Sequence, residues 1–149
     1  MRQTLRAYVR RRTGVPLGHR SSLRNMLRRS FGAPTLGGFW RYWNPIWSYG
    51  LSRFVHAPLR RIAGPAPALL GTFAVSGLLH DAVIMALRGQ PALLFTPWFL
   101  LVGVGILAAD ARGIGFSGLT FGVRALLHTA FLTITFLTTT WTVRALGLW

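Results

Sequence analysis

The sequence contains no cysteine and no lysine, and it has only two acidic residues, Asp81 and Asp110. The absence of cysteine excludes disulfides, thiolate metal ligands and a thiol nucleophile. Because carboxylates are so few, the chain has almost nothing to pair with its 17 basic residues, all of which are arginine. A net charge of +15 therefore predicts an external counter-charge, which either nucleic acid or anionic lipid headgroups would supply.

The distribution of charge and hydropathy decides between these two partners. Only 13% of the residues are charged, against about 25% in ordinary soluble domains, and 52% are hydrophobic. Most arginines fall in residues 1–61, and the remainder of the chain is mostly apolar. This layout predicts an all-α membrane protein whose arginines meet membrane lipids and not nucleic acid. By the positive-inside rule, we expect a multi-pass protein of the bacterial cytoplasmic membrane with its basic N-terminal half in the cytoplasm.

Residues 1–30 form the first segment of the basic half. Their arginines include two sets spaced four apart, at positions 2, 6 and 10 and at positions 20, 24 and 28. Such spacing aligns each set on one helical face and predicts interfacial helices, interrupted in the Gly14–Gly18 stretch that contains Pro16. A disordered basic tail is the alternative for residues 1–20.

Residues 31–61 form the second segment, which contains three tryptophans and four arginines. Indole rings favour the headgroup level of a membrane, and arginines there bury their stems while their guanidinium groups stay at phosphate depth. We therefore expect amphipathic interfacial helices. The i, i+3, i+7 spacing of Trp40, Trp43 and Trp47 predicts a single helical stripe.

Residues 62–149 are predicted to contain about three transmembrane helices. A spanning helix needs about 20 mostly apolar residues. Windows of this kind lie at 62–87, 92–109 and 121–143, the second being rather short. Threonines are frequent in the third window, where they can hydrogen-bond to backbone carbonyls and pack against neighbouring helices.

His80 lies within the first of these windows, in the stretch FAVSGLLHD. Ionisable groups are costly in hydrocarbon and so mark functional sites, and imidazole is suited to act as a general base toward a hydroxyl. Ser76 precedes it by one turn on the same face, and Gly77 leaves room for a second backbone or a ligand. Asp81 need not touch the imidazole, because consecutive helical residues point about 100° apart. A structural hydrogen bond to a neighbouring helix is the alternative role for His80.

Asn44 is the second polar candidate, set between Trp43 and Pro45. Its amide is suited to orienting a substrate carbonyl or hydroxyl, and asparagine is also a frequent helix N-cap. Pro45 suits the first turn of a helix that starts near Asn44, and Pro58 marks a further break or restart. The remaining histidines give weaker indications: solvated side chains at positions 19 and 56, and either a structural role or a polar cavity at position 128. Histidines and aspartates show no metal-ligand spacing, so no metal site is expected.

Three short motifs occur in order over residues 39–80 and together resemble one family. They are FWRYWN at 39–44, HAPLR at 56–60 and FAVSGLLH at 73–80. In this order they resemble the membrane-bound O-acyltransferase superfamily, and they are most similar to its wax-synthase-like and its sterol or diacylglycerol acyltransferase branches. The resemblance covers residues 21–110 and corresponds to the C-terminal portion of such proteins.

The resemblance implies transfer of an acyl group from a thioester such as acyl-CoA to a lipid-borne alcohol, with no bound cofactor. In that reaction His80 would be the general base that deprotonates the alcohol, and Asn44 would assist at the acyl carbonyl. Further residues of the same motifs are expected to contact substrate: Trp40, Arg41, Trp43 and Ser76.

The short length leads to two expectations about partners. Superfamily members carry many more spans around the histidine, so a second copy of the chain or a partner membrane subunit would complete the chamber. The alternative function is a non-catalytic accessory subunit of a larger membrane complex. In that case the tryptophans would contact lipid or the partner, and His80 would form a buried hydrogen bond.

Overall fold

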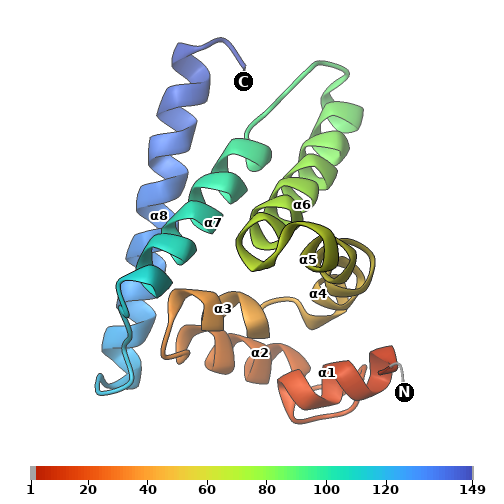
Figure 1. The fold of residues 1–149 in the computed structure, drawn as a ribbon, viewed down its shortest axis with the longest axis vertical. Coiled ribbons are helices and arrows are strands. Elements are labelled where there is room, and N and C mark those ends of the chain that lie inside the picture. Colours follow the sequence, from red (N-terminus) through yellow and green to blue (C-terminus); the bar gives the residue numbers. More distant parts are fainter. Residues whose placement is uncertain (1–2, 149) are drawn as a thin grey trace.

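A computed structural model describes residues 3–148, in which every regular element is a helix and no strand occurs. Arg2, the first arginine of the predicted stripe, lies outside these residues. A group of short helices, which we call the foot, gathers at one end of three longer helices (Figure 1). The foot comprises α1 (Leu5–Thr13), α2 (Ser22–Phe31), α3 (Leu36–Tyr42), α4 (Pro45–Leu51), the π-helix η1 (Ser52–His56) and α5 (Ala57–Ala63).

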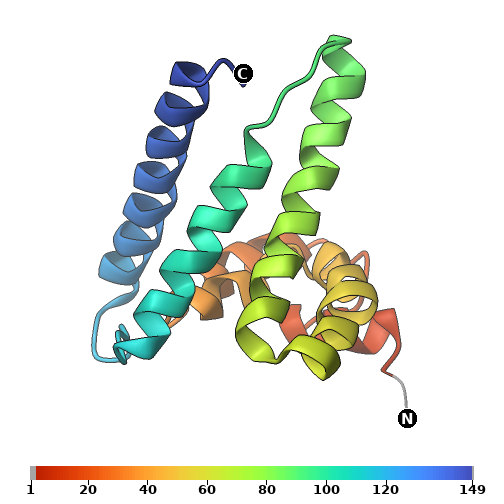
Figure 2. The same cartoon turned by 45° about the horizontal axis from the view of Figure 1, so that its top comes forward.

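The three longer helices are α6 (Pro65–Arg88), α7 (Phe95–Ala111) and α8 (Phe121–Ala145). They stand side by side and alternate in direction, so that α6 and α8 begin at the foot and α7 returns to it (Figure 1 and Figure 2). Both α6 and α8 are long and apolar enough to cross a membrane, whereas α7 is apolar but has only 17 residues. The described residues therefore contain two candidate spans and one shorter apolar helix.

The first two helices of the foot are joined by side chains of α2 that reach the end of α1. Gly14 ends α1 in the left-handed conformation, with φ 79°. The Asn25 side-chain amide donates to the Thr13 carbonyl at 2.9 Å, and Arg29 donates to the Arg12 carbonyl at 2.9 Å. A cation at a helix C-terminus also complements the helix dipole. Residues 5–13 thus form a helix that is docked on α2.

The single tryptophan stripe expected from the i, i+3, i+7 spacing is wrong. α3 ends at Tyr42, and Asn44 adopts a left-handed conformation with φ 38° before α4 begins at Pro45. Asparagine is one of the few non-glycine residues that tolerate this conformation. Because the chain changes direction there, helical spacing across the break does not place Trp43 and Trp47 on one face.

The chain from α4 through η1 to α5 continues without a non-helical interruption. Within it, the Ala57 N–H reaches back to the Ser52 carbonyl, and Pro58 follows in the first turn of α5. The restart predicted at Pro58 therefore takes the form of a π-turn. Gly64, with φ 84°, then turns the chain into α6, whose first residue is Pro65.

Asp81 explains why α7 begins where it does. Its fully buried carboxylate accepts hydrogen bonds from the backbone N–H groups of Leu94, Phe95 and Thr96 at 3.0, 2.7 and 2.8 Å. The first N–H groups of a helix have no partner within the helix, and the dipole favours an anion there. Asp81 is therefore a structural cap that joins α6 to α7, and both of its carboxylate oxygens accept hydrogen bonds from α7.

Gly77 allows α6 and α7 to approach each other closely. A Cβ added at this position would lie 2.5 Å from the Thr96 Cα and 2.8 Å from the Phe95 carbonyl oxygen. We expect Gly77→Ala to destabilise the protein by about 1–3 kcal/mol, because backbone atoms of α7 would have to move. Gly122→Ala is the matched control, since nothing lies within 4 Å of its added Cβ. Thermal unfolding in detergent should separate the two variants, and equal melting temperatures would contradict this packing.

Candidate active site

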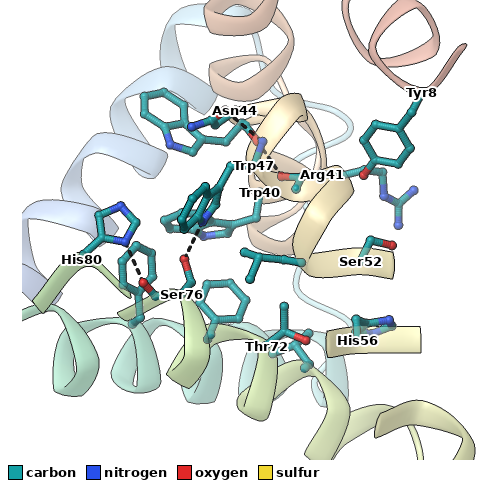
Figure 3. A pocket seen from close by; sticks show the side chains of 16 residues that line it. Tyr8, Trp40, Arg41, Asn44, Trp47, Ser52, His56, Thr72, Ser76 and His80 are labelled. Atoms are coloured by element: carbon teal, nitrogen blue, oxygen red, sulfur yellow. Dashed lines mark hydrogen bonds between the residues drawn. The ribbon is translucent and has the colours of Figure 1, made fainter. Parts of the chain in front are cut away.

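A cavity of about 290 Å³ lies where the foot meets α6 and α7. We call it the His80 cavity (Figure 3). It is lined by all six residues that the sequence proposed for catalysis or substrate contact: Trp40, Arg41, Trp43, Asn44, Ser76 and His80. These residues come from α3, the α3–α4 turn and α6, and the fold alone brings them together.

The imidazole of His80 is held in one tautomer. Its Nδ1 lies 2.6 Å from the backbone carbonyl oxygen of Ser76, one turn earlier in α6. A carbonyl oxygen only accepts hydrogen bonds, so Nδ1 carries the proton and donates it. In the neutral imidazole Nε2 then carries the lone pair, and it makes no hydrogen bond within the described residues. This is the state that a general base needs before it removes a proton.

Aromatic rings surround the same imidazole. Its ring centroid lies 5.7 Å from that of Trp47, 5.4 Å from that of Phe95 and 5.3 Å from that of Phe99. The Trp47 contact is edge-to-face, with an interplanar angle of 80°. Contacts from α4 and α7 thus fix the orientation of a half-buried side chain on α6.

A chain of hydrogen bonds links Asn44 to His80. The Asn44 Oδ1 accepts from the Trp47 backbone N–H at 3.3 Å, and the Trp47 indole Nε1–H donates to the Ser76 Oγ at 3.0 Å. The Ser76 backbone carbonyl then accepts from His80, as described above. Figure 3 shows these three links in sequence. Trp47 is the residue of this hydrogen-bonded series that was not predicted from the sequence to lie in the site.

Of the two roles that the sequence left open for Asn44, the structure shows the helix cap. Its Oδ1 caps α4, whereas its side-chain nitrogen makes no hydrogen bond within the described residues. The residue is exposed and lines the His80 cavity, so the two amide protons are accessible from the cavity. The cap fixes the side chain, and the free N–H groups remain available for an acceptor such as a carbonyl oxygen.

The other predicted contact residues form the walls of the cavity. Trp40 packs edge-on against Phe73 and Phe99, with centroid distances of 5.2 and 5.5 Å. Trp43 stacks on Phe39 at 5.2 Å. Arg41 is exposed and also lines the cavity. The result is an apolar aromatic interior next to a charged group, which suits a ligand with both apolar and polar parts.

The remaining histidines occupy different positions. His128 is buried, and its Nε2 lies 3.0 Å from the Ala33 carbonyl oxygen, so it joins α8 to the α2–α3 connection and is not among the residues that line the His80 cavity. His56 is half-buried and lines the cavity, although the sequence predicted a solvated side chain. The sequence feature that could have indicated a place for His56 in the site is its position in the HAPLR motif. His19 is exposed.

The fold and the site define a helical membrane protein with a histidine-bearing cavity between an arginine-rich foot and apolar helices. The model of the membrane bound O-acyl transferase family matches residues 23–102, more than half of the chain, and this protein belongs to that family. The matched range contains all of the residues in the hydrogen-bonded series from Asn44 to His80. No curated protein and no solved structure matches the chain significantly.

Proposed function

We propose that this chain transfers an acyl group from a thioester, such as acyl-CoA, to the hydroxyl of a lipid-borne alcohol. The observation that carries the proposal is the state of His80, whose Nδ1–H is held by the Ser76 carbonyl while Nε2 is free beside a cavity. The cavity lies between the foot and the apolar helices. A water-borne thioester and a membrane-borne alcohol would meet at such a boundary.

In the proposed reaction, Nε2 of His80 removes the proton of the alcohol as its oxygen attacks the thioester carbonyl carbon. The tetrahedral intermediate then collapses, the carbon–sulfur bond breaks, and the thiolate takes the proton from Nε2. The hydrogen bond from Nδ1 to the Ser76 carbonyl supports the imidazolium that exists between these two transfers. The products are an ester and a free thiol.

Asn44 is proposed to act at the acyl carbonyl. The negative charge that develops on the carbonyl oxygen requires hydrogen-bond donors that are already in place. The side-chain N–H groups of Asn44 line the same cavity as His80, and the α4 cap holds their amide in position. Trp40, Arg41, Trp43 and Ser76 would contact the rest of the substrates.

We propose three spans, formed by α6, α7 and α8, in the bacterial cytoplasmic membrane. With 17 residues, α7 is roughly 25 Å long, slightly less than the hydrocarbon thickness of about 30 Å. The Asp81 cap supports this placement, because it satisfies the backbone N–H groups at the start of α7 that hydrocarbon could not satisfy. The arginine-rich foot would face the cytoplasm and contact anionic headgroups.

We further propose that a second copy or a partner membrane subunit completes the substrate chamber. Drug-sized ligands occupy pockets of about 300–1,000 Å³, and a lipid alcohol together with a long-chain thioester is larger than such ligands. The His80 cavity, at about 290 Å³, holds only part of such a pair. For the acceptor, we propose an alcohol of the kind used by the wax-synthase-like branch or by the sterol or diacylglycerol acyltransferase branch.

The alternative is a non-catalytic accessory subunit of a larger complex. It is favoured by the outward apolar surface of α8, where Leu126, Ile134 and Trp141 are 67%, 64% and 75% exposed. A partner helix would cover this surface as well as lipid does.

The two functions are separated by supplying the purified chain, in lipid nanodiscs, with radiolabelled acyl-CoA and a mixture of lipid alcohols. Label in an extractable ester supports the enzyme, whereas no ester from the chain, alone or with co-purified partners, supports the accessory role.

The contact between Trp47 and Ser76 predicts a graded effect on catalysis. Trp47→Phe removes the indole N–H but keeps an aromatic ring beside His80. A lost hydrogen bond of about 1 kcal/mol corresponds to a roughly fivefold lower rate of ester formation. Trp141→Phe is the matched control, because Trp141 lies on the outer face of α8 and is 75% exposed. Equal rates for both variants would show that Trp47 does not position the base.

A further inference from the structure

A second cavity, of about 500 Å³, lies between α2, the α2–α3 connection, the last residue of α3 and the first residue of α8. We call it the headgroup cleft. Its lining carries four polar side chains that can donate hydrogen bonds, together with apolar and backbone groups, and no acidic residue. The four are Asn25, Arg28, Arg29 and Tyr42.

The positive charge of this cleft has no counter-charge within the described residues. No ion pair joins Arg28 or Arg29 to a carboxylate among residues 3–148. Asp81 uses both of its oxygens on α7, and Asp110 lies in the last turn of α7 and does not line the cleft. An anion from outside the chain is therefore the group that the cleft would attract.

The polar groups of the cleft divide into structural and available ones. Arg29 donates to the Arg11 and Arg12 carbonyls, and Asn25 donates to the Thr13 carbonyl, so both hold α1. Arg28 is exposed, and neither its guanidinium nor the Tyr42 hydroxyl makes a hydrogen bond within the described residues. A planar guanidinium fork and a phenol that line the same cavity are a suitable donor set for a phosphate group.

The apolar wall of the cleft indicates what the phosphate is attached to. Phe121 lines the cleft and is 53% exposed, although it is the first residue of a candidate membrane-spanning helix. Val123 and Leu126 are also exposed on α8 but lie on another face of the helix, so Phe121 is the large apolar side chain that the cleft itself presents. A free phosphate would gain nothing from this exposed ring, whereas the first methylene groups of a phospholipid acyl chain would pack against it.

The walls of the cleft are fixed to each other. Arg124, in the first turn of α8, donates to the Gly32 carbonyl at 3.1 Å and also to the Ser117 carbonyl. His128, one turn further, contacts the Ala33 carbonyl at 3.0 Å. Gly32 and Ala33 themselves line the cleft. The start of α8 is thus held against α2, and a ligand would not have to bring the two helices together.

We infer that the headgroup cleft binds one anionic phospholipid, with the phosphate on Arg28 and Tyr42 and the acyl chain against Phe121 at the start of α8. The inference does not depend on the proposed reaction, because the cleft and the His80 cavity share no residue. It also goes beyond a diffuse attraction of the foot to the membrane surface, since it assigns one saturable site.

The test measures bound lipid per chain on the full-length protein, by native mass spectrometry after titration with phosphatidylglycerol or phosphatidylcholine. We expect one phosphatidylglycerol to be retained in preference to phosphatidylcholine. Arg28→Gln should weaken this binding about tenfold, because it removes charged hydrogen bonds to the phosphate. Tyr42→Phe should weaken it less. Arg24→Gln is the matched control, an exposed arginine of the same helix that does not line the cleft.

Three outcomes would overturn the inference. Equal weakening by Arg24→Gln and Arg28→Gln would indicate diffuse electrostatic attraction, and equal retention of the two lipids would indicate no anion selection. Displacement of the lipid by millimolar inorganic phosphate or glycerol phosphate would indicate a site for a soluble anion. Phe121→Ala should weaken lipid binding without creating sensitivity to soluble phosphate, and circular dichroism of each variant checks that its helices are retained.

Discussion

Replacing His80 with alanine is expected to lower the rate of ester formation by about 10²- to 10⁴-fold, the usual contribution of a positioned general base. Within the described residues this side chain hydrogen-bonds only to its own helix, at Ser76, so the substitution breaks no hydrogen bond between helices. It does remove the ring contacts with Trp47, Phe95 and Phe99, so the melting temperature of the variant is measured alongside its rate. The measurement is the initial rate at which label passes from acyl-CoA into lipid ester, with equal amounts of wild-type and variant protein in nanodiscs.

His19→Ala is the control for this prediction, because His19 is exposed and does not line the cavity. Its rate should equal that of the wild type. Asn44→Asp provides a second comparison, since a carboxylate oxygen can still cap α4 while the amide N–H donors are lost. A slow Asn44→Asp variant with a normal melting temperature would support a role at the acyl carbonyl. An active His80→Ala variant would exclude His80 as the base.

Asp81→Ala is expected to give the largest loss of stability in the chain, about 3 kcal/mol or more. The substitution leaves one buried and two partly buried N–H groups at the start of α7 without an acceptor, and each unsatisfied buried group costs about 1–3 kcal/mol. Asp81→Asn retains one carbonyl oxygen and should fall between the alanine variant and the wild type. Thermal unfolding of the detergent-solubilised protein, followed by circular dichroism, compares the three.

Asp110→Ala serves as the control for Asp81, because this exposed carboxyl accepts none of the hydrogen bonds that hold the start of α7. Its melting temperature should stay close to that of the wild type. If Asp81→Ala unfolded at the wild-type temperature, the carboxylate would not be the group that holds α7 on α6. A loss of ester formation with unchanged stability would instead point to a role of Asp81 in the reaction.

The helical character of the chain was predictable from simple physical signals. Apolar windows of about 20 residues indicate spans without knowledge of what they pack against, since length and hydropathy alone satisfy the membrane. Glycine and proline likewise mark ends locally, as at Gly14, but the predicted span at 62–87 ran through Gly64 and Pro65, where the chain in fact turns into α6. These are properties of a few consecutive residues, so no tertiary information is needed to detect them.

The start of α7 was not predictable in the same way, and at Asn44 the sequence contains two opposing signals, since Pro45 indicated a helix start that the tryptophan spacing did not. The left-handed φ of Asn44 interrupts a tryptophan spacing that is compatible with one continuous helix, and sequence periodicity carries no sign of the interruption. The start of α7 depends on Asp81, which lies 13 residues before Leu94 on another helix. Apolar composition alone is compatible with a helix that starts at residue 92.

The candidate site likewise contains residues that were predictable from the sequence and one residue that was not. The motif residues Asn44, Ser76 and His80 were identified from the sequence, and the structure places all of them around one cavity. Trp47 was missed because its decisive contact, the hydrogen bond to Ser76, joins residues 29 positions apart. One local signal was present, since an N-cap asparagine binds the N–H two or three positions further along, and Trp47 is third after Asn44.

The most direct test of the proposed acyl transfer is to count the thiol and the ester formed by the purified protein from the same sample. Because the chain has no cysteine, a thiol reagent reports only the thiol released from the acyl donor. With acyl-CoA and a lipid alcohol, the proposed reaction predicts one thiol for each ester with wild-type protein, and neither product above background with His80→Ala. Thiol released together with free fatty acid, or no thiol from the wild type in any lipid, would contradict acyl transfer by this chain.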